Sequence, residues 1–191
     1  MKTELDLELT MCGSARTGFN TLLQRGFYMT CRAGMSVREF MREVLGYDDL
    51  LIDNDVRTVF LNSSPLDGLD TTHLQDGDRL ALGSAMPGLV GICMGRDNPY
   101  REFRSSIGLV RHDAVETGEI IRVFVKIFSV LAVDTGADIL QRGIETEREP
   151  LIALLKKGGD NLLSEGEAGA AEILDSLRRG KGTVRLQVRF V

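Results

Sequence analysis

The chain has 191 residues, of which 43% are apolar, and this is enough to bury one ordinary core or two small ones. Its formal net charge is −5, and no stretch approaches the roughly 18 apolar residues that a transmembrane helix needs. The N-terminal residues alternate between charged and apolar side chains and do not form a secretion signal. We therefore expect a cytoplasmic protein with no membrane partner.

The negative charge is concentrated in the first half of the chain. Residues 1–91 hold 8 basic and 13 acidic side chains, whereas residues 92–191 hold 15 of each. Because an acidic surface repels phosphate backbones, we expect no nucleic-acid partner. The acidic side chains predict either a solvated face or a docking surface for a basic protein. The aspartates concerned are Asp48, Asp49, Asp53, Asp55, Asp67, Asp70, Asp76 and Asp78.

Two strands and a helix are predicted at the start of the chain. Residues 3–11 alternate between apolar and acidic side chains, the period of a half-buried strand. After an apolar turn at residues 22–23, a second strand begins at Gly26, and we expect the two strands to form a hairpin with a wide connection. Ser36 and Glu39 have the spacing of a capping box and predict a helix start. The apolar face of that helix is predicted to be Val37, Phe40, Met41, Val44 and Leu45.

Further strands follow the predicted helix. Residues 50–52 predict a short edge strand, and residues 59–61 predict another that ends at Asn62. The turn signal at residues 76–78 leads into a last strand over residues 79–82. The order strand, strand, helix, strand, strand is that of the ubiquitin-like β-grasp, so the expected fold class is α+β.

Three short motifs in this region resemble the sulfur carriers typified by the small subunit of molybdopterin synthase and the thiamine-pathway carrier. They are Phe60-Leu61-Asn62, Leu74-Gln75-Asp76-Gly77-Asp78 and Ala85-Met86-Pro87-Gly88. The resemblance implies a β-grasp and, in the carriers themselves, a free C-terminal Gly-Gly that is converted to a thiocarboxylate. Here the chain continues beyond Gly88 and Gly91, so a carrier function would require cleavage near them.

Residues 92–117 are interpreted as a connecting segment. Its basic side chains, Arg96, Arg101, Arg104 and Arg111, are interleaved with Tyr100 and Phe103. Short apolar runs at residues 89–94 and 107–110 predict strands of their own. Basic residues with aromatics can indicate single-stranded nucleic-acid binding, but the acidity of the whole chain argues against it.

The second half contains an echo of the first. Leu22-Leu23-Gln24-Arg25-Gly26 is repeated as Ile139-Leu140-Gln141-Arg142-Gly143, in each case between predicted strands. Helices follow at residues 150–155 and, after a capping-box spacing of Ser164 and Glu167, at residues 170–177. A closing strand spans residues 183–190. We expect either two tandem β-grasp domains, at 1–91 and 118–191 with the second degenerate, or a single α+β domain with an unrelated C-terminal half.

No pattern in the chain predicts catalysis, a metal site or a bound cofactor. The three cysteines, Cys12, Cys31 and Cys93, are too few for a disulfide framework and favour free thiols. Cys12 precedes Arg16 too closely for a phosphate-binding thiolate loop. The two histidines, His73 and His112, have no cysteine or carboxylate at ligand spacing.

We therefore expect a non-catalytic ubiquitin-like binding or adaptor protein, which could be accessory to sulfur or molybdopterin-type cofactor metabolism. The alternatives are a sulfur carrier activated by proteolysis near Gly88 or Gly91, and a small-molecule or thiol enzyme with an interdomain cleft. Homo-oligomerisation is expected through the strand at 183–190, interpreted as a free edge. The candidate partner-binding residues are Asp53, Asp55, Asp76, Asp78, Met86, Pro87, Gly88, Gly91, Arg101 and Arg104.

Overall fold

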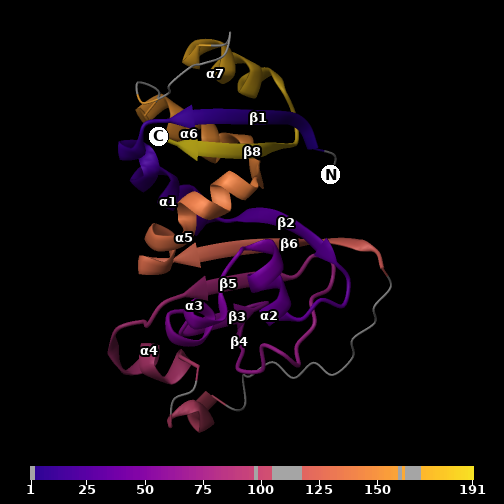
Figure 1. Ribbon diagram of the computed structural model, residues 1–191, viewed down its shortest axis with the longest axis vertical. Helices are drawn as coiled ribbons and strands as arrows, with labels where there is room; N and C mark the ends of the chain where they lie inside the picture. Colours follow the sequence, from indigo (N-terminus) through magenta and orange to yellow (C-terminus); the bar gives the residue numbers. More distant parts are fainter. Residues whose placement is uncertain (1–2, 97–98, 105–117, 159–160, 162–168) are drawn as a thin grey trace. The chain divides into compact units, whose positions relative to one another are not determined.

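The computed structural model describes residues 3–96, 99–104, 118–158, 161 and 169–191 (Figure 1). It contains both helices and strands that pair in parallel and antiparallel fashion, which confirms the α+β class. The chain divides into two compact units: unit 1 comprises residues 1–27 and 133–191, and unit 2 comprises residues 28–132. The expected domains at residues 1–91 and 118–191 are segments predicted to fold independently. That domain division stays a prediction. Within the described ranges, no helix is both long and apolar enough to cross a membrane.

The sheet of unit 1 has β8 (Thr183–Phe190) at its centre. It pairs in parallel with β1 (Thr3–Met11) and antiparallel with β7 (Ile144–Glu147), so that Leu186 faces Leu7 on one side and Ile144 on the other. The predicted alternation of β8 is confirmed, since Val184, Leu186 and Val188 are buried. Its prediction as a free edge for self-association was wrong, because β1 and β7 occupy both of its sides.

In the described part of unit 1 lie four α-helices: α1 (Arg16–Arg25), α5 (Ser129–Arg142, which begins in unit 2), α6 (Arg148–Gly158) and α7 (Ala170–Arg179). The apolar pair at residues 22–23, predicted as a turn, lies in α1 and is buried. The predicted hairpin of the first two strands was also wrong, because β1 pairs with β8. The alternation of a strand identifies its buried face but not its partner.

The sheet of unit 2 has the strand order β2-β6-β5-β3-β4. The strands are β2 (Phe27–Arg32), β3 (Thr58–Leu61), β4 (Ser64–Pro65), β5 (Arg79–Gly83) and β6 (Ile120–Phe128). β5 pairs in parallel with β6, and β3 pairs antiparallel with both β5 and β4. The parallel partner of β5 therefore comes from later in the chain, where Phe124 pairs with Arg79, and not from the N-terminal strand β1.

The predicted capping box in unit 2 is confirmed. The Glu39 amide donates to Ser36 Oγ at 3.2 Å, and the Ser36 amide donates to Glu39 Oε2 at 2.8 Å. These two hydrogen bonds cap the start of α2 (Val37–Glu39), which continues as a π-helical turn over Phe40–Val44. Most of the predicted apolar face is buried: Val37, Phe40, Met41 and Leu45.

Two short apolar runs predicted as strands form helices. Residues 50–52 lie in α3 (Asp49–Asn54), where the Asp48 carboxylate accepts the Leu51 amide at 2.8 Å, and residues 89–94 lie in α4 (Gly88–Met94), which follows Pro87. A short apolar run does not distinguish a strand from a buried helix. A 3₁₀ turn spans Arg101–Arg104. The predicted strand at 107–110 and the capping box of Ser164 and Glu167 lie outside the described residues.

The two copies of the sequence echo have the same local structure. Each ends a helix, α1 or α5, and each terminal glycine has a positive φ, 112° at Gly26 and 93° at Gly143. A strand follows at once in both cases, β2 or β7. The order strand, helix, glycine, strand thus occurs twice in the chain.

The sheet of unit 2 predicts which fragment of the chain folds alone. A fragment of residues 26–132 contains all five of its strands, whereas residues 1–91 lack β6 beside β5 and β8 beside β1. We expect cooperative urea unfolding, followed by circular dichroism, for 26–132 and no transition for 1–91. Cooperative unfolding of 1–91 would contradict the pairing of β5 with β6.

The capping box predicts a pH dependence of stability. Hydrogen bonds from the Ser36 amide and then its side chain lower the pKa of Glu39 below its ordinary value of 4.5. A lowered carboxyl pKa contributes stability that is present above the ordinary value and is lost as the pH falls through the lowered one. In urea unfolding at pH 3–7, we expect wild type to exceed Glu39→Gln in stability at neutral pH and to converge with it in acid. A difference that does not change with pH would exclude this role.

Candidate functional site

A cavity of about 340 Å³ lies in unit 1 between α1 and α6. This volume is at the lower end of the range found for small-ligand sites. Its apolar lining comes from the end of β1 and from the facing sides of the two helices. The apolar residues are Met11, Ala15, Phe19, Leu22, Pro150, Ala153 and Leu154.

Small residues on the facing sides of the helices keep the cavity open. Gly18 lies on α1, and a Cβ added there would come within 4.0 Å of Leu154 Cδ1 on α6. Pro150 stands in the first turn of α6, where its missing amide hydrogen costs nothing, and Ala153 follows one turn later. The helices are held instead by their buried residues, Phe19 and Leu22 on α1 and Leu151 and Leu155 on α6.

The polar lining of this cavity contains cations and neutral groups. Arg25 lies in the last turn of α1 and Lys157 in the last turn of α6, so each also opposes the negative end of its helix. The neutral groups are Ser14, Thr17, Thr21 and Asn161. No carboxylate and no histidine is among the described lining residues. The cavity therefore favours an anion, and its described lining offers no side chain that would exchange a proton near neutral pH.

Cys12 lies next to the cavity, where β1 leads into a 3₁₀ turn over Gly13–Ala15. Its amide donates to the Asn161 carbonyl at 2.9 Å, and the Gly13 amide donates to the Val191 carbonyl at 2.8 Å. The Ser14 hydroxyl lies 3.4 Å from Cys12 Sγ and 3.4 Å from Asn161 Oδ1. Hydrogen bonds from the Ser14 hydroxyl and then its amide lower the pKa of Cys12, which favours the thiolate.

The other cysteines differ from Cys12 in environment. Cys31 is buried, and its burial and then the charge of Asp78 raise the pKa of its thiol to about 11. Cys93 lies on α4 and is partly exposed. Within the described ranges, no group of three or more His, Cys, Asp or Glu side chains could hold a metal ion.

Several of the predicted acidic docking residues pair within unit 2. The Arg38 guanidinium lies 2.9 Å from carboxylate oxygens of both Asp53 and Asp70, and 3.6 Å from one of Asp49. Hydrogen bonding to Asp53 is the main cause that raises the pKa of Arg38. Asp55 ends α3. The acidity counted along the sequence is thus partly balanced in space by one arginine.

Asp76 and Asp78, both predicted as partner-binding residues, make hydrogen bonds within the fold. Asp78 is 4% exposed and accepts the Asn62 side-chain amide and the Gln75 amide, both at 2.8 Å. The Asp76 carboxylate accepts the Arg122 amide of β6 at 2.9 Å. The motif around residues 76–78 therefore joins β3, β5 and β6, with Asp78 buried and Asp76 exposed.

Arg104, also predicted as a partner-binding residue, is buried, at 3% exposure. Its Nη2 donates to Asp67 Oδ1 at 2.6 Å and to the Gly95 carbonyl at 3.0 Å. Arg96 is likewise buried and donates to the carbonyls of Ile52 and Val56 at the end of α3. The side chain of Arg101 lies outside the described residues.

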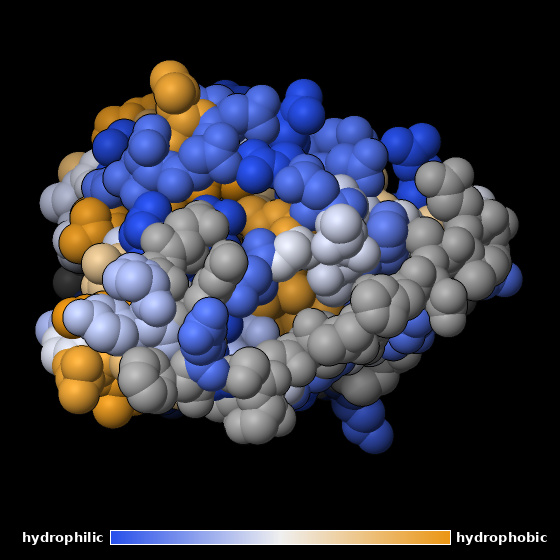
Figure 2. All heavy atoms as spheres, turned by 90° about the horizontal axis from the view of Figure 1, so that it is seen from below, coloured by the Kyte–Doolittle hydropathy of each residue, from blue (hydrophilic) through white to orange (hydrophobic). Residues whose placement is uncertain are grey.

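Of the predicted contact residues at 86–91, Met86 and Pro87 precede α4, and Gly88 and Gly91 lie at its start. Met86 is 42% exposed, Gly88 has a φ of 83°, and a Cβ at Gly91 would lie 2.4 Å from the Met86 carbonyl oxygen. Apolar side chains gather at the left edge of Figure 2, the side on which α4 lies in Figure 1. The exposed ones on α4 are Leu89, Val90 and Ile92.

The cavity was missed from the sequence because its cations, Arg25 and Lys157, lie far apart in the chain. The available signal was Ala153 in the helix predicted at residues 150–155 and Lys157 just beyond it, whereas Gly18 lies in α1, which was not predicted as a helix. Comparison of the chain with protein-family models, curated proteins and solved structures finds no match. The functional interpretation of the cavity therefore rests on its geometry and lining residues alone.

Cys12 is predicted to be the most reactive thiol of the folded protein. In alkylation by iodoacetamide followed by mass spectrometry, we expect the midpoint of its pH-rate profile to lie below the ordinary value of 9.0. Ser14→Ala should raise that midpoint by removing the hydrogen bond to the thiolate, whereas the remote Ser176→Ala should not. Cys31 should react only after denaturation. Equal profiles for Ser14→Ala and wild type would refute the role of Ser14.

Proposed function

We propose that this protein is a non-catalytic binding module that holds a small amphipathic anion in the cavity of unit 1. The observation that carries the proposal is the lining: two cations and several hydroxyls above an apolar floor, with no carboxylate among the described lining residues. Recognition of this kind fixes the orientation of a ligand with few polar groups and gains affinity from apolar burial. The ligand class is a carboxylate or phosphate with a short apolar body.

Each part of the cavity has a role in this proposal. Arg25 presents a planar guanidinium, which matches the two oxygens of a carboxylate, and Lys157 adds a second charge. Ser14 and the threonines supply neutral donors. Phe19, Leu22 and Leu154 would cover the apolar body. Without a general acid or base in the described lining, the cavity is suited to holding this ligand and not to converting it.

We also propose that the fold derives from two ubiquitin-like β-grasp modules. In a β-grasp the first strand pairs in parallel with the last, and two such parallel pairs support the proposal: β1 with β8, and β6 with β5. The repeated order strand, helix, glycine, strand supports a duplication. Each module would then be completed by the first strand of the other. An adaptor role with a protein partner, accessory to sulfur or molybdopterin-type cofactor metabolism, remains part of this proposal.

The sulfur-carrier alternative has less physical support. Cleavage near Gly88 or Gly91 would fall between β5 and β6, which pair side by side in unit 2. A released fragment would lose the strand that covers one side of β5. The thiol-enzyme alternative would depend on Cys12 or the partly exposed Cys93, since burial raises the pKa of Cys31.

Octanoate binding tests the proposed function. We expect isothermal titration calorimetry to detect octanoate binding to the full chain and much weaker binding of neutral octanol. Arg25→Gln and Lys157→Gln should each weaken octanoate binding roughly tenfold or more, as loss of a charged hydrogen bond predicts. Lys156→Gln, the adjacent residue on α6 that does not line the cavity, is the matched control.

Filling the cavity gives a second variant. Gly18→Leu should place a side chain against Leu154 and abolish octanoate binding, while Gly18→Ala should raise stability by about 0.5–1 kcal/mol because alanine is the better helix former. The proposed function fails if octanoate does not bind, or if Lys156→Gln and Lys157→Gln weaken binding equally.

A further inference from the structure

The sheet of unit 2 carries an array of cations and aromatic rings on one face. The ring centroids of Tyr28 on β2 and Phe124 on β6 lie 4.9 Å apart at an angle of 62°. The Arg122 guanidinium lies 3.5 Å from the centroid of Tyr28, and that of Arg79 on β5 lies 4.5 Å from the centroid of Phe124. Lys126 Nζ lies 5.9 Å from the same ring. We call these five residues the cation–ring face.

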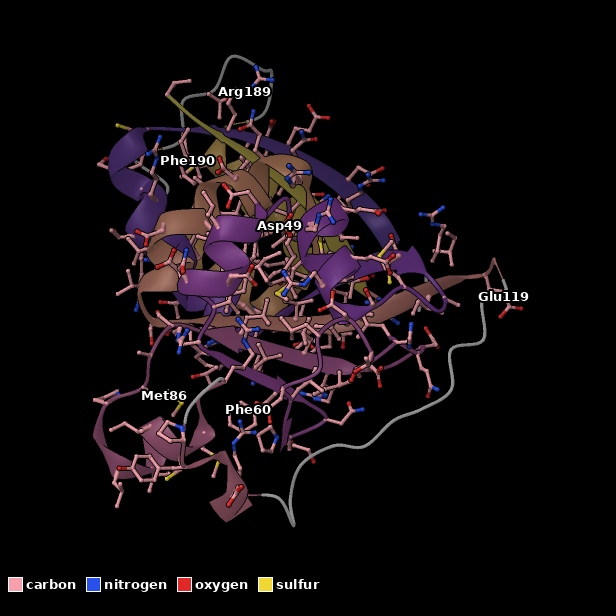
Figure 3. All side chains as sticks on the ribbon, turned by 60° about the horizontal axis from the view of Figure 1, so that its bottom comes forward. Asp49, Phe60, Met86, Glu119, Arg189 and Phe190 are labelled. Atoms are coloured by element: carbon pink, nitrogen blue, oxygen red, sulfur yellow. The ribbon has the colours of Figure 1, made fainter. Side chains whose placement is uncertain are left out.

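The alternation of the strands places this face opposite the core. On β5 and β6 the residues between its members are buried, with Leu80, Val123 and Val125 at 1% exposure or less, so they form the core side with the helix that begins at Val37. Phe60, which pairs with Ala81 of β5, and Asp49 of α3 lie on opposite sides of this sheet (Figure 3). Arg79 is exposed, and the other four members of the face are partly exposed.

The charge of this face is opposite to that of the chain. The described positions that share this side of β3, β5 and β6 include three cations and no carboxylate. The formal net charge of the chain is −5. Asp49, Asp53 and Asp70 pair with Arg38. Arg38 lies on the helix α2 and not on a strand of the sheet. The acidity of the whole chain therefore does not describe this surface.

We propose that the cation–ring face binds single-stranded nucleic acid. Bases stack on aromatic rings and on guanidinium planes without regard to sequence, and cations beside the rings contact the phosphates. From β2 to β5 the face spans two strand spacings, or roughly 10 Å, which fits about two unstacked nucleotides. An acidic peptide would pair with the cations but has no planar base to stack on the guanidinium groups and rings. The argument from overall acidity against a nucleic-acid partner thus does not hold for this face.

Fluorescence anisotropy with a labelled 12-nucleotide RNA, the same sequence as DNA, and the 12-base-pair duplex tests the proposal on the full chain. We expect the single strands to bind more tightly than the duplex, with a slope of log K against log salt near −2 because three cations are involved. The RNA and DNA arms identify which single strand is preferred. Unlabelled poly-glutamate of equal charge should compete poorly.

Variants separate the rings from the charges. Phe124→Ala should weaken single-strand binding on the order of tenfold, and Arg79→Gln with Lys126→Gln should weaken it and flatten the salt slope. Arg42→Gln, an exposed arginine on the helical side of unit 2, should leave binding unchanged. If Phe124→Ala lowers the melting temperature, the charge variants carry the test. The proposal is overturned by no binding at 50 mM salt, by tighter duplex binding, by full competition from poly-glutamate, or by equal loss with Arg42→Gln.

Discussion

Two parallel strand pairs determine the rest of this structure. β1 pairs with β8 and β5 pairs with β6, and in both cases the partners are separated by long stretches of chain. Parallel neighbours cannot be joined by a tight turn, so each pair requires the intervening segments to fold as crossovers. The helix α4 lies in the segment between β5 and β6, and all the described α-helices lie in the long segment between β1 and β8. The entropy of closing such long loops has to be offset by the buried residues of the strands.

Each candidate surface depends on one of these pairs. The pairing of β1 with β8 fixes Cys12 and Gly13 beside Asn161 and Val191, from which α1 runs along α6 and encloses the cavity. The pairing of β5 with β6 brings Arg79 opposite Phe124 and thereby creates the cation–ring face. Both surfaces join residues that are remote in sequence. A change of partner in either pair would remove the surface that depends on it.

Local signals in the sequence predicted local structure well. Ser36 and Glu39 form the expected capping box, and the alternation of residues 183–190 is that of a half-buried strand. The partner of a strand was not predictable, because alternation fixes its buried face and not its neighbour. Residues 50–52 show a further limit of sequence patterns, because a short apolar run fits a strand and a helix equally well. Here Asp48 caps a helix. The charge counted along the chain did not predict where charge lies in space. Arg38 pairs with three of the aspartates, and the cations of the cavity and of the cation–ring face lie on other surfaces.

The pairing of β1 with β8 is tested most directly by an engineered disulfide. Asp6 and Arg185 are exposed register partners, so cysteines at these positions should lie within the Cα separation of a disulfide. With Cys12 and Cys93 replaced by serine, the account predicts that Asp6→Cys with Arg185→Cys oxidises in the folded chain and raises its melting temperature. A chain in which that pair stays reduced, while Asp6→Cys crosslinks to Thr30→Cys on β2 as in a hairpin, would contradict it.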